Sequence, residues 1–284
     1  MKNNQLKIFL IELLFFSATL LLGIAVAVNI EELIQAAHAE NGGNEELISA
    51  LSFLVYFVIA TGLVFLVSKS EKLKKKRLLF FRVAFLFSVA FGSLITLSVF
   101  LGELISLFLI IILLLLWKRK PVIILHNLLI VFSIAGIGAV MGAMLDTLAI
   151  VFFLVLFSIY DVIAVYKTKH MVKMATEMIK TKAILGLIIP SSFGGLFDNL
   201  EKKKKKEFMV LGGGDLAFPL FLVASVAISY GINQALAVAF FSTMGLFFSF
   251  FFFITQKEKK PIPALPPIAL FSILGYLITT LFIG

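Results

Sequence analysis

Apolar residues fall into nine long segments that are separated by short polar connections. A transmembrane helix needs about 20 mostly apolar residues, with a range of about 17–25. All but the fourth segment reach this range, and a short span is accommodated by local thinning of the bilayer. The pattern predicts an all-α polytopic membrane protein with nine transmembrane helices: Ile8–Asn29, Leu47–Val67, Leu78–Phe100, Leu104–Trp117, Pro121–Leu145, Thr147–Tyr166, Phe208–Tyr230, Asn233–Thr255 and Ala264–Gly284.

A tenth apolar stretch, Ala183–Phe197, contains Pro190 and two adjacent glycines. We interpret it as part of a loop at the membrane interface. The chain then divides into six helices over residues 1–166, a basic cytoplasmic loop over 167–207 and three helices over 208–284. Methionines at helical spacing in this loop fit either an amphipathic helix on the membrane surface or a solvated basic linker.

Basic residues give the expected orientation of the helices, because cytoplasmic loops carry an excess of Lys and Arg. Of the 25 basic residues, 24 lie at the N-terminus or in alternate connections, and Arg82 lies close to the inside end of the third span. The connection between the first two spans is acidic. Nine spans place every basic residue on one side, whereas eight or ten spans do not. We therefore predict an N-terminus inside and a C-terminus outside a cell membrane.

Composition agrees with this interpretation. Hydrophobic residues make up 61% of the chain and charged residues only 14%, against about 45–50% and about 25% in soluble domains. This balance excludes a soluble enzyme or a nucleic-acid-binding module as a description of the whole chain. The net charge of +9 is explained by an inside-facing basic surface in contact with membrane lipid, so we expect no nucleic-acid partner. Cysteine is absent, which excludes thiolate chemistry.

Three acidic residues lie inside the predicted spans: Glu12, Asp161 and Asp215. An intramembrane charge costs roughly 2.5–3.5 kcal/mol on insertion scales and points to a function. We expect Glu12, about one turn into the first helix, to reach the headgroups. Asp161 lies about 9 Å of helix from Lys167, and Asp215 lies about 13 Å from Lys206. The two aspartates therefore fall at similar depth on antiparallel helices.

Two carboxyl groups without a basic partner in a low dielectric are expected to share one proton. This is the arrangement of an aspartic protease, in which one carboxylate activates water while its protonated partner polarises the peptide carbonyl. A proton or cation relay in a transporter uses membrane acids in the same way. Depth and charge alone leave these two functions equal.

Sequence motifs surround both aspartates. Asp161 follows Tyr160, and Asp215 follows three glycines, each of which costs about 1 kcal/mol in a helix relative to alanine. The segment Pro261–Pro267 holds four of the seven prolines. We expect it to be non-helical, because proline lacks the backbone donor and clashes with the preceding turn.

These motifs resemble those of presenilins and signal peptide peptidases, the intramembrane aspartyl proteases. The YD motif is matched by Tyr160–Asp161, the GxGD motif by Gly212–Asp215 and the PAL motif by Pro263–Leu265, in order on the sixth, seventh and ninth spans. The compact chain looks like an archaeal presenilin homologue. The resemblance covers residues 160–265 by motif, and the N-terminal half only by helix number and hydropathy.

The resemblance implies an aspartic endopeptidase that cleaves transmembrane segments of protein or peptide substrates, with no cofactor and no metal. Asp161 and Asp215 match the catalytic pair, and Tyr160 precedes the first aspartate and is placed to orient it. The remaining implied site residues support the aspartates or shape the active site: Gly212, Gly213, Gly214, Pro263, Ala264 and Leu265. Gly213 departs from the leucine often found in presenilins, which suggests a wider choice of substrate. A homo-oligomer is left open.

An unwound substrate needs new backbone partners, because bare amides in lipid cost several kcal/mol. The segment Phe208–Leu211 is either a strand edge that pairs with the substrate or simply the start of a helix, and the sequence weights both equally.

A zinc protease is disfavoured because the three histidines are scattered. A prepilin peptidase shares GxGD but leaves the PAL segment unexplained. A transporter predicts matching broken helices in two halves, which the sequence lacks.

The predicted topology has a direct test. A reporter fused after Gly284 is expected to lie outside the cytoplasm, because nine spans reverse the side of the N-terminus. A reporter fused before Met1 is the matched control and is expected inside. Cytoplasmic activity of the C-terminal fusion would contradict the nine-span arrangement.

Overall fold

The computed structural model describes residues 3–41, 74–167, 184–200, 208–256 and 261–282, with single helical positions at 52, 55 and 59. The predicted second span, most of Leu47–Val67, and residues 168–183 and 201–207 of the expected basic loop lie outside this part of the chain. The described helices are α1 (Asn3–Asn41), α3 (Lys74–Leu101), α4 (Glu103–Arg119), α5 (Ile123–Met144), α6 (Thr147–Val162), α8 (Gly213–Ser229), α9 (Ile232–Thr255) and α10 (Leu265–Phe282).

The described part of the chain is mostly helical, as predicted. Five of its helices are long and apolar enough to cross a membrane, namely Gln5–Glu31, Arg82–Leu101, Ile123–Met144, Thr147–Lys167 and Ile232–Thr255. The apolar helices α8 and α10 are shorter. The observed helix bounds lie within a few residues of the predicted spans, with two exceptions. Helix α1 continues to Asn41, well beyond the predicted end at Asn29, and the N-terminal part of the seventh span is not helical.

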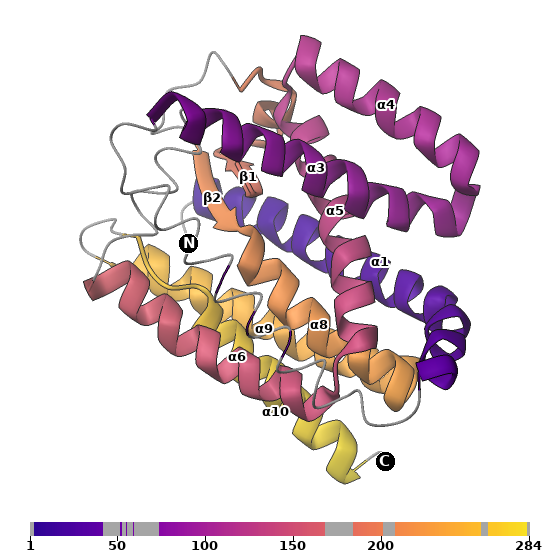
Figure 1. The fold of residues 1–284 in the computed structure, drawn as a ribbon. Helices are drawn as coiled ribbons and strands as arrows, with labels where there is room; N and C mark the ends of the chain where they lie inside the picture. Colours follow the sequence, from indigo (N-terminus) through magenta and orange to yellow (C-terminus); the bar gives the residue numbers. More distant parts are fainter. Residues whose placement is uncertain are drawn as a thin grey trace.

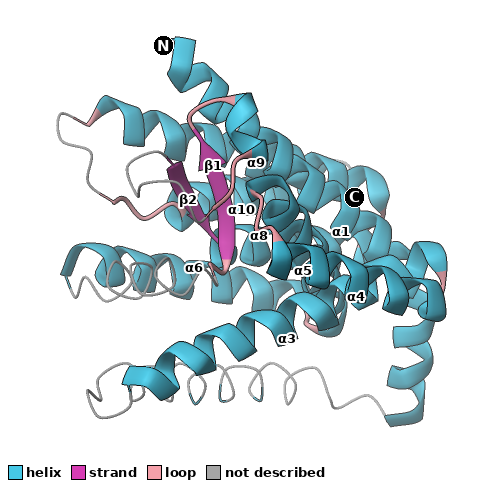
Figure 2. Ribbon diagram, turned by 90° about the horizontal axis from the view of Figure 1, so that it is seen from above, coloured by secondary structure: helices cyan, strands magenta, loops and turns pink. Residues whose placement is uncertain are grey.

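The helices form a bundle with α8 at its centre (Figures 1 and 2). Helices α1, α5, α6, α9 and α10 all pack against α8, while α3 and α4 lie beside α5 on the outer side of the bundle. Leu220 of α8 lies between Gly23 of α1 and Gly138 of α5, where a Cβ atom would overlap its side chain. Small residues at such contacts let membrane helices approach closely, so these glycines position α8.

Hydroxyl groups join neighbouring helices in the bundle. Ser242 of α9 and Ser272 of α10 are 2.7 Å apart, and Thr147 of α6 lies 2.7 Å from Ser225 of α8. All four side chains are buried. Each buried hydroxyl thus has a partner, which fixes the axial position of one helix against the next.

A two-stranded antiparallel sheet lies at the N-terminal end of α8. Strand β1 (Gly186–Pro190) pairs with β2 (Phe208–Gly212), with Leu187 opposite Leu211 and Ile189 opposite Met209. The pairing continues one step further, because the amide of Gly213 donates to the carbonyl of Leu185 at 2.9 Å. Strand β2 therefore runs directly into α8 with no intervening loop (Figure 1).

The outer edge of β1 is held by α5. The side-chain amide of Asn127 donates to the carbonyl of Ile188 at 2.8 Å, and its oxygen accepts from the Ile188 amide at 2.9 Å. One side chain thus replaces a neighbouring strand. His126 adds a contact of 3.2 Å between Nε2 and the carbonyl of Gly186. These bonds anchor the strand pair in the buried core.

The structure corrects three expectations from the sequence, in whole or in part. The stretch Ala183–Phe197 contains the fully buried strand β1, so the expectation of an interfacial loop is wrong for those residues. The segment Phe208–Gly212 is a strand, which excludes a helix start there. In the proline-rich segment, residues 261–264 are non-helical as expected, but Pro266 and Pro267 lie inside α10. Proline is tolerated in the first turn, where its missing amide would have no intrahelical partner.

Candidate active site

Asp161 lies near the C-terminal end of α6, immediately before a π-helical turn, Ile163–Lys167. Such turns break the regular hydrogen-bond pattern and are frequent at functional sites. The side chain of Asp161 is 5% exposed. Its Oδ2 atom accepts a hydrogen bond of 3.3 Å from the backbone amide of Leu265. The YD and PAL residues, far apart in sequence, are therefore brought together.

Asp215 lies in the first turn of α8, directly after the glycines. Its Oδ2 atom accepts from the backbone amide of Gly212 at 3.2 Å, which is one half of a capping box. Amide groups at a helix start also favour an anion nearby. The side chain of Asp215 is half-buried. Burial and backbone contacts thus hold this carboxyl group at the entry to α8.

The helices that carry the two aspartates, α6 and α8, pack against each other. One turn away from them, the rings of Phe157 on α6 and Phe218 on α8 stack with centroids 4.4 Å apart. Phe157 precedes Asp161 by four residues and Phe218 follows Asp215 by three, so each ring shares a helix face with its aspartate. The aromatic stack therefore holds the two acid-bearing faces together.

Each glycine of the GxGD segment meets a different neighbour. A Cβ atom on Gly212 would lie 3.0 Å from Asp215 Oδ2, and one on Gly213 would lie 3.0 Å from the carbonyl oxygen of Leu185. Gly214 is exposed, and its Cβ would lie 3.4 Å from the ring of Phe218. Gly213 thus faces the strand pair. A side chain there would press on the backbone before β1, which gives this glycine a packing role.

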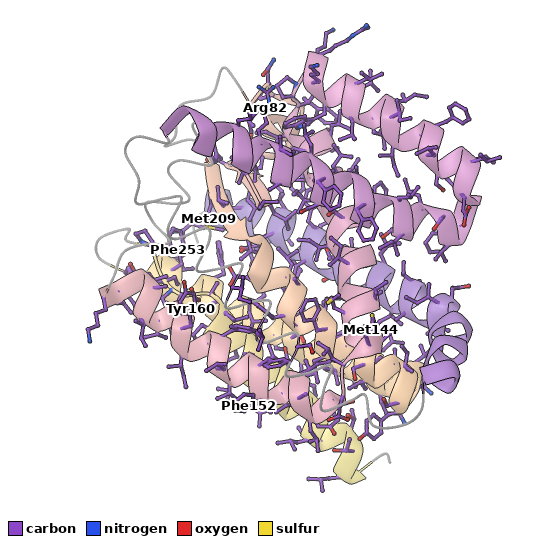
Figure 3. The ribbon with its side chains drawn as sticks, viewed as in Figure 1. Arg82, Met144, Phe152, Tyr160, Met209 and Phe253 are labelled. Carbon is purple, nitrogen blue, oxygen red and sulfur yellow. The ribbon has the colours of Figure 1, made fainter. Side chains whose placement is uncertain are left out.

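The remaining predicted residues line the surroundings of the pair. Tyr160 is 40% exposed and lies at the same end of the bundle as Met209 of β2 and Phe253 of α9 (Figure 3). No hydrogen bond joins its side chain to Asp161 among the described residues. Pro263 and Ala264 are half-buried in the extended segment before α10. Leu265 contributes its backbone amide, as described above.

Two features of this region were missed by sequence reasoning. Glu12 of α1 is only 3% exposed and is buried among the helices, so the expectation that it reaches the headgroups is wrong. Strand β1 was also missed, because its apolar run between glycines carries no polar alternation. The position of Glu12 within an apolar helix was the feature of the sequence that could have indicated its burial.

A family model described as signal-peptide peptidase, presenilin aspartyl protease matches residues 11–284. The chain belongs to this family. It is an intramembrane aspartic endopeptidase and an integral multi-pass membrane protein. No curated protein matches the chain at a significant level.

Two solved structures share the fold of this chain. A presenilin family intramembrane aspartate protease in space group C222 matches with a TM-score of 0.62 and 21% identity, covering 95% of this chain and 98% of that chain. A second structure with the same description, in space group P2, matches with a TM-score of 0.58 and 21% identity over 94% and 96%. The shared fold extends over nearly the whole chain.

The position of Gly212 against Asp215 yields a prediction. Gly212→Ala is expected to lower kcat by about tenfold or more. The sequence resemblance assigns Asp215 a catalytic role, and displacing such a group by up to about 1 Å is costly. The backbone of Gly212, at φ −63° and ψ 146°, suits alanine, so the fold is expected to persist. Cleavage of a single-span peptide and thermal unfolding in detergent measure both effects.

Gly194→Ala is the matched control, because its added Cβ meets no atom within 4 Å. Equal activity of the two variants would show that Gly212 does not position the carboxyl group.

Proposed function

We propose that Asp161 and Asp215 are the catalytic pair with which this protease hydrolyses peptide bonds within transmembrane segments of membrane proteins. The observation that supports the proposal is the packing of α6 against α8, which each carry one buried or half-buried carboxyl group bonded to a backbone amide. Two such groups in a low dielectric hold one proton between them.

One proton on the pair supplies both roles that peptide hydrolysis requires. The ionised carboxylate takes a proton from a water molecule, and the water oxygen attacks the peptide carbonyl carbon. The protonated partner donates a hydrogen bond to the carbonyl oxygen. A proton then passes to the leaving amine as the C–N bond breaks, and the pair returns to its starting state. The transporter alternative is not favoured, since the family is one of proteases.

Substitution of either aspartate tests this proposal. Asp161→Asn and Asp215→Asn are each expected to abolish cleavage of a single-span peptide in detergent, because an amide cannot activate water. Asp146→Asn is the matched control. Asp146 is exposed and caps α6 through its side chain, a role that asparagine also performs.

Wild-type protein is further expected to show a bell-shaped pH profile, with activity lost at low pH when both acids are protonated and at high pH when both are ionised. Residual turnover in either aspartate variant, or a rate independent of pH, would remove the pair from the mechanism.

The free edge of β2 is proposed to bind the unwound substrate as a third strand. In an antiparallel pair, successive residues alternate between facing the partner and facing outward. The backbone of Ile188 bonds to Asn127 on the outer side of β1, whereas the carbonyl of Leu185 accepts from the amide of Gly213 across the pair. The backbone amides and carbonyls of Met209 and Leu211 therefore face β1. The amides and carbonyls of Phe208 and Val210 then face away, and no further strand covers them within the described residues.

This edge leads directly to Asp215, so a strand paired with it passes the acid pair. The PAL segment, with Pro263 and Ala264 half-buried and Leu265 bonded to Asp161, is proposed to form the opposite wall. The exposed ring of Tyr160 is proposed to contact the same substrate. The nine-span arrangement with an inside N-terminus belongs to this proposal, and it is supported by the segregation of all 25 basic residues.

Removal of one outward backbone amide tests the strand model. Val210→Pro is expected to lower kcat/KM by roughly tenfold, because one strand hydrogen bond is lost and the ring blocks the edge. Proline is tolerated on an edge strand, so the unfolding temperature is expected to change little. Val210→Ala is the control that shortens the side chain and keeps the amide. If both variants cleave equally well, the substrate does not pair with this edge.

A further inference from the structure

A cavity lies at the end of the bundle where β2 begins. Its volume is about 250 Å³, and it is lined by α1, by the end of α9 and by residues at the strand pair. Two of the lining residues, Met209 of β2 and Phe253 of α9, lie at the same end of the bundle as Tyr160 (Figure 3). The cavity is therefore beside the strand that is proposed to bind substrate.

One face of the strand pair borders the cavity. Ile189 of β1 and Met209 of β2 are directly opposite each other, so their side chains project from the same face of the sheet. Both residues line the cavity, and Met209 is half-buried. A substrate strand added to the free edge of β2 extends this face.

The register places one substrate residue next to Met209. The backbone groups of Met209 face β1, so on the free edge Met209 and the substrate residue opposite it form no mutual hydrogen bonds. In such a pair of an antiparallel sheet the Cα atoms are about 4.5 Å apart and the side chains lie close together. The side chain of that substrate residue shares the face of Met209 and Ile189, which borders the cavity.

The same register relates the cavity to the acid pair. Oδ2 of Asp215 accepts from the amide of Gly212, at the other end of β2. Gly212 follows Met209 by three residues, which is about 10 Å of strand at about 3.3 Å per residue. The substrate residue opposite Met209 is therefore about three residues from the part of the substrate that passes the carboxyl group.

The lining of the cavity suits an apolar side chain. Ile8, Phe250 and Phe253 contribute apolar groups, and among the described residues the lining includes two polar side chains, Gln5 and Ser191, but no charged one. A charged side chain buried there has no opposite charge to pair with, which is costly. An apolar cavity of about 150 Å³ is enough for benzene. This larger cavity therefore has room for leucine, methionine or phenylalanine.

Aromatic packing fixes the helical wall of the cavity. The buried ring of Phe9, next to Ile8 in α1, lies 5.1 Å from the ring of Phe250 and 5.6 Å from that of Phe247, centroid to centroid. These contacts hold the start of α1 against the end of α9. The wall is thus formed in the protein without substrate, as is usual for ligand pockets.

We propose that this cavity is a substrate subsite, which receives one large apolar side chain about three residues from the cleaved bond. The inference rests on the proposed function, because it takes the substrate to pair with β2 beside Asp215. Transmembrane segments are apolar along their whole length, so hydrophobicity alone does not select a peptide bond within them. A subsite of limited volume at a fixed distance from the acids makes that selection by side-chain size.

Cleavage of single-span peptides by the full-length protein in detergent tests the subsite. The peptides carry leucine, alanine or aspartate at successive positions on both sides of the bond that mass spectrometry shows to be cut. At one position, about three residues from this bond, alanine is expected to lower kcat/KM at least about tenfold relative to leucine, and aspartate further. Equal kcat/KM values for leucine and alanine at all such positions would overturn the proposal.

Variants of Ile8 connect this preference to the cavity. Ile8→Trp fills the cavity and is expected to lower the ratio of kcat/KM for leucine to that for alanine by roughly tenfold at this position. Ile8→Ala widens the cavity and is expected to raise the ratio for phenylalanine to leucine. Leu14→Trp and Leu14→Ala are the matched controls, because Leu14 is 60% exposed on the same helix. Wild-type ratios in the folded Ile8 variants, or in Ile8→Ala alone if Ile8→Trp does not fold, would assign the preference elsewhere and overturn the subsite.

Photocrosslinking locates the side chain without turnover. A peptide with a diazirine analogue of leucine at the selected position is expected to label residues 5–8 of α1 or 250–254 of α9 in Asp215→Asn protein. The same analogue one residue along the peptide is the control, because successive strand side chains face opposite sides. Labelling confined to other segments would refute the subsite. The proposed function fails separately, if wild-type protein cleaves no peptide or either aspartate variant remains active.

Discussion

The pairing of β1 with β2 is the constraint on which the site depends. The pairing extends to a hydrogen bond from the amide of Gly213 to the carbonyl of Leu185. On the other edge of β1, the side chain of Asn127 bonds to the backbone of Ile188. Because β2 ends where α8 begins, the strand pair fixes where that helix starts. Asp215 stands in the first turn, so its position follows from backbone pairing rather than from side-chain packing. Backbone groups in a membrane must be paired, which makes this arrangement difficult to displace.

The position of Asp161 depends on a different set of contacts. The stack of Phe157 on Phe218 brings α6 against α8, and the amide of Leu265 reaches Asp161 from the start of α10. Three helices thus converge near Asp161, through the stacked rings of α6 and α8 and the backbone amide at the start of α10. For the proposed catalytic pair, such fixed contacts avoid reorganisation during the reaction. Asp215 is partly exposed, whereas Asp161 is buried.

Sequence reasoning predicted most of the helices, because apolar runs of spanning length have few alternatives in a membrane. The bounds of α5, α6 and α9 agree with prediction to within a few residues. It failed where backbone pairing decides the structure. From the sequence, the apolar run of β1 was interpreted as a loop between glycines. Pro266 and Pro267 were expected to prevent a helix, although they occupy the first turn of α10. The strand depends on hydrogen bonds to distant residues. The prolines are accommodated because the first amides of a helix have no intrahelical partner.

The sequence by itself determined the membrane class, the residues of the three motifs and the family they resemble, since these depend on local composition and spacing. The tertiary structure decided which distant groups meet, such as Leu265 with Asp161 and Leu185 with Gly213, and which groups are buried, such as Glu12. Glu12 shows the difference most clearly. Its helix position permits a path to the headgroups, and only the packing of α1 against its neighbours turns it inward. Burial is a property of the neighbours a residue acquires on folding, which no local pattern contains.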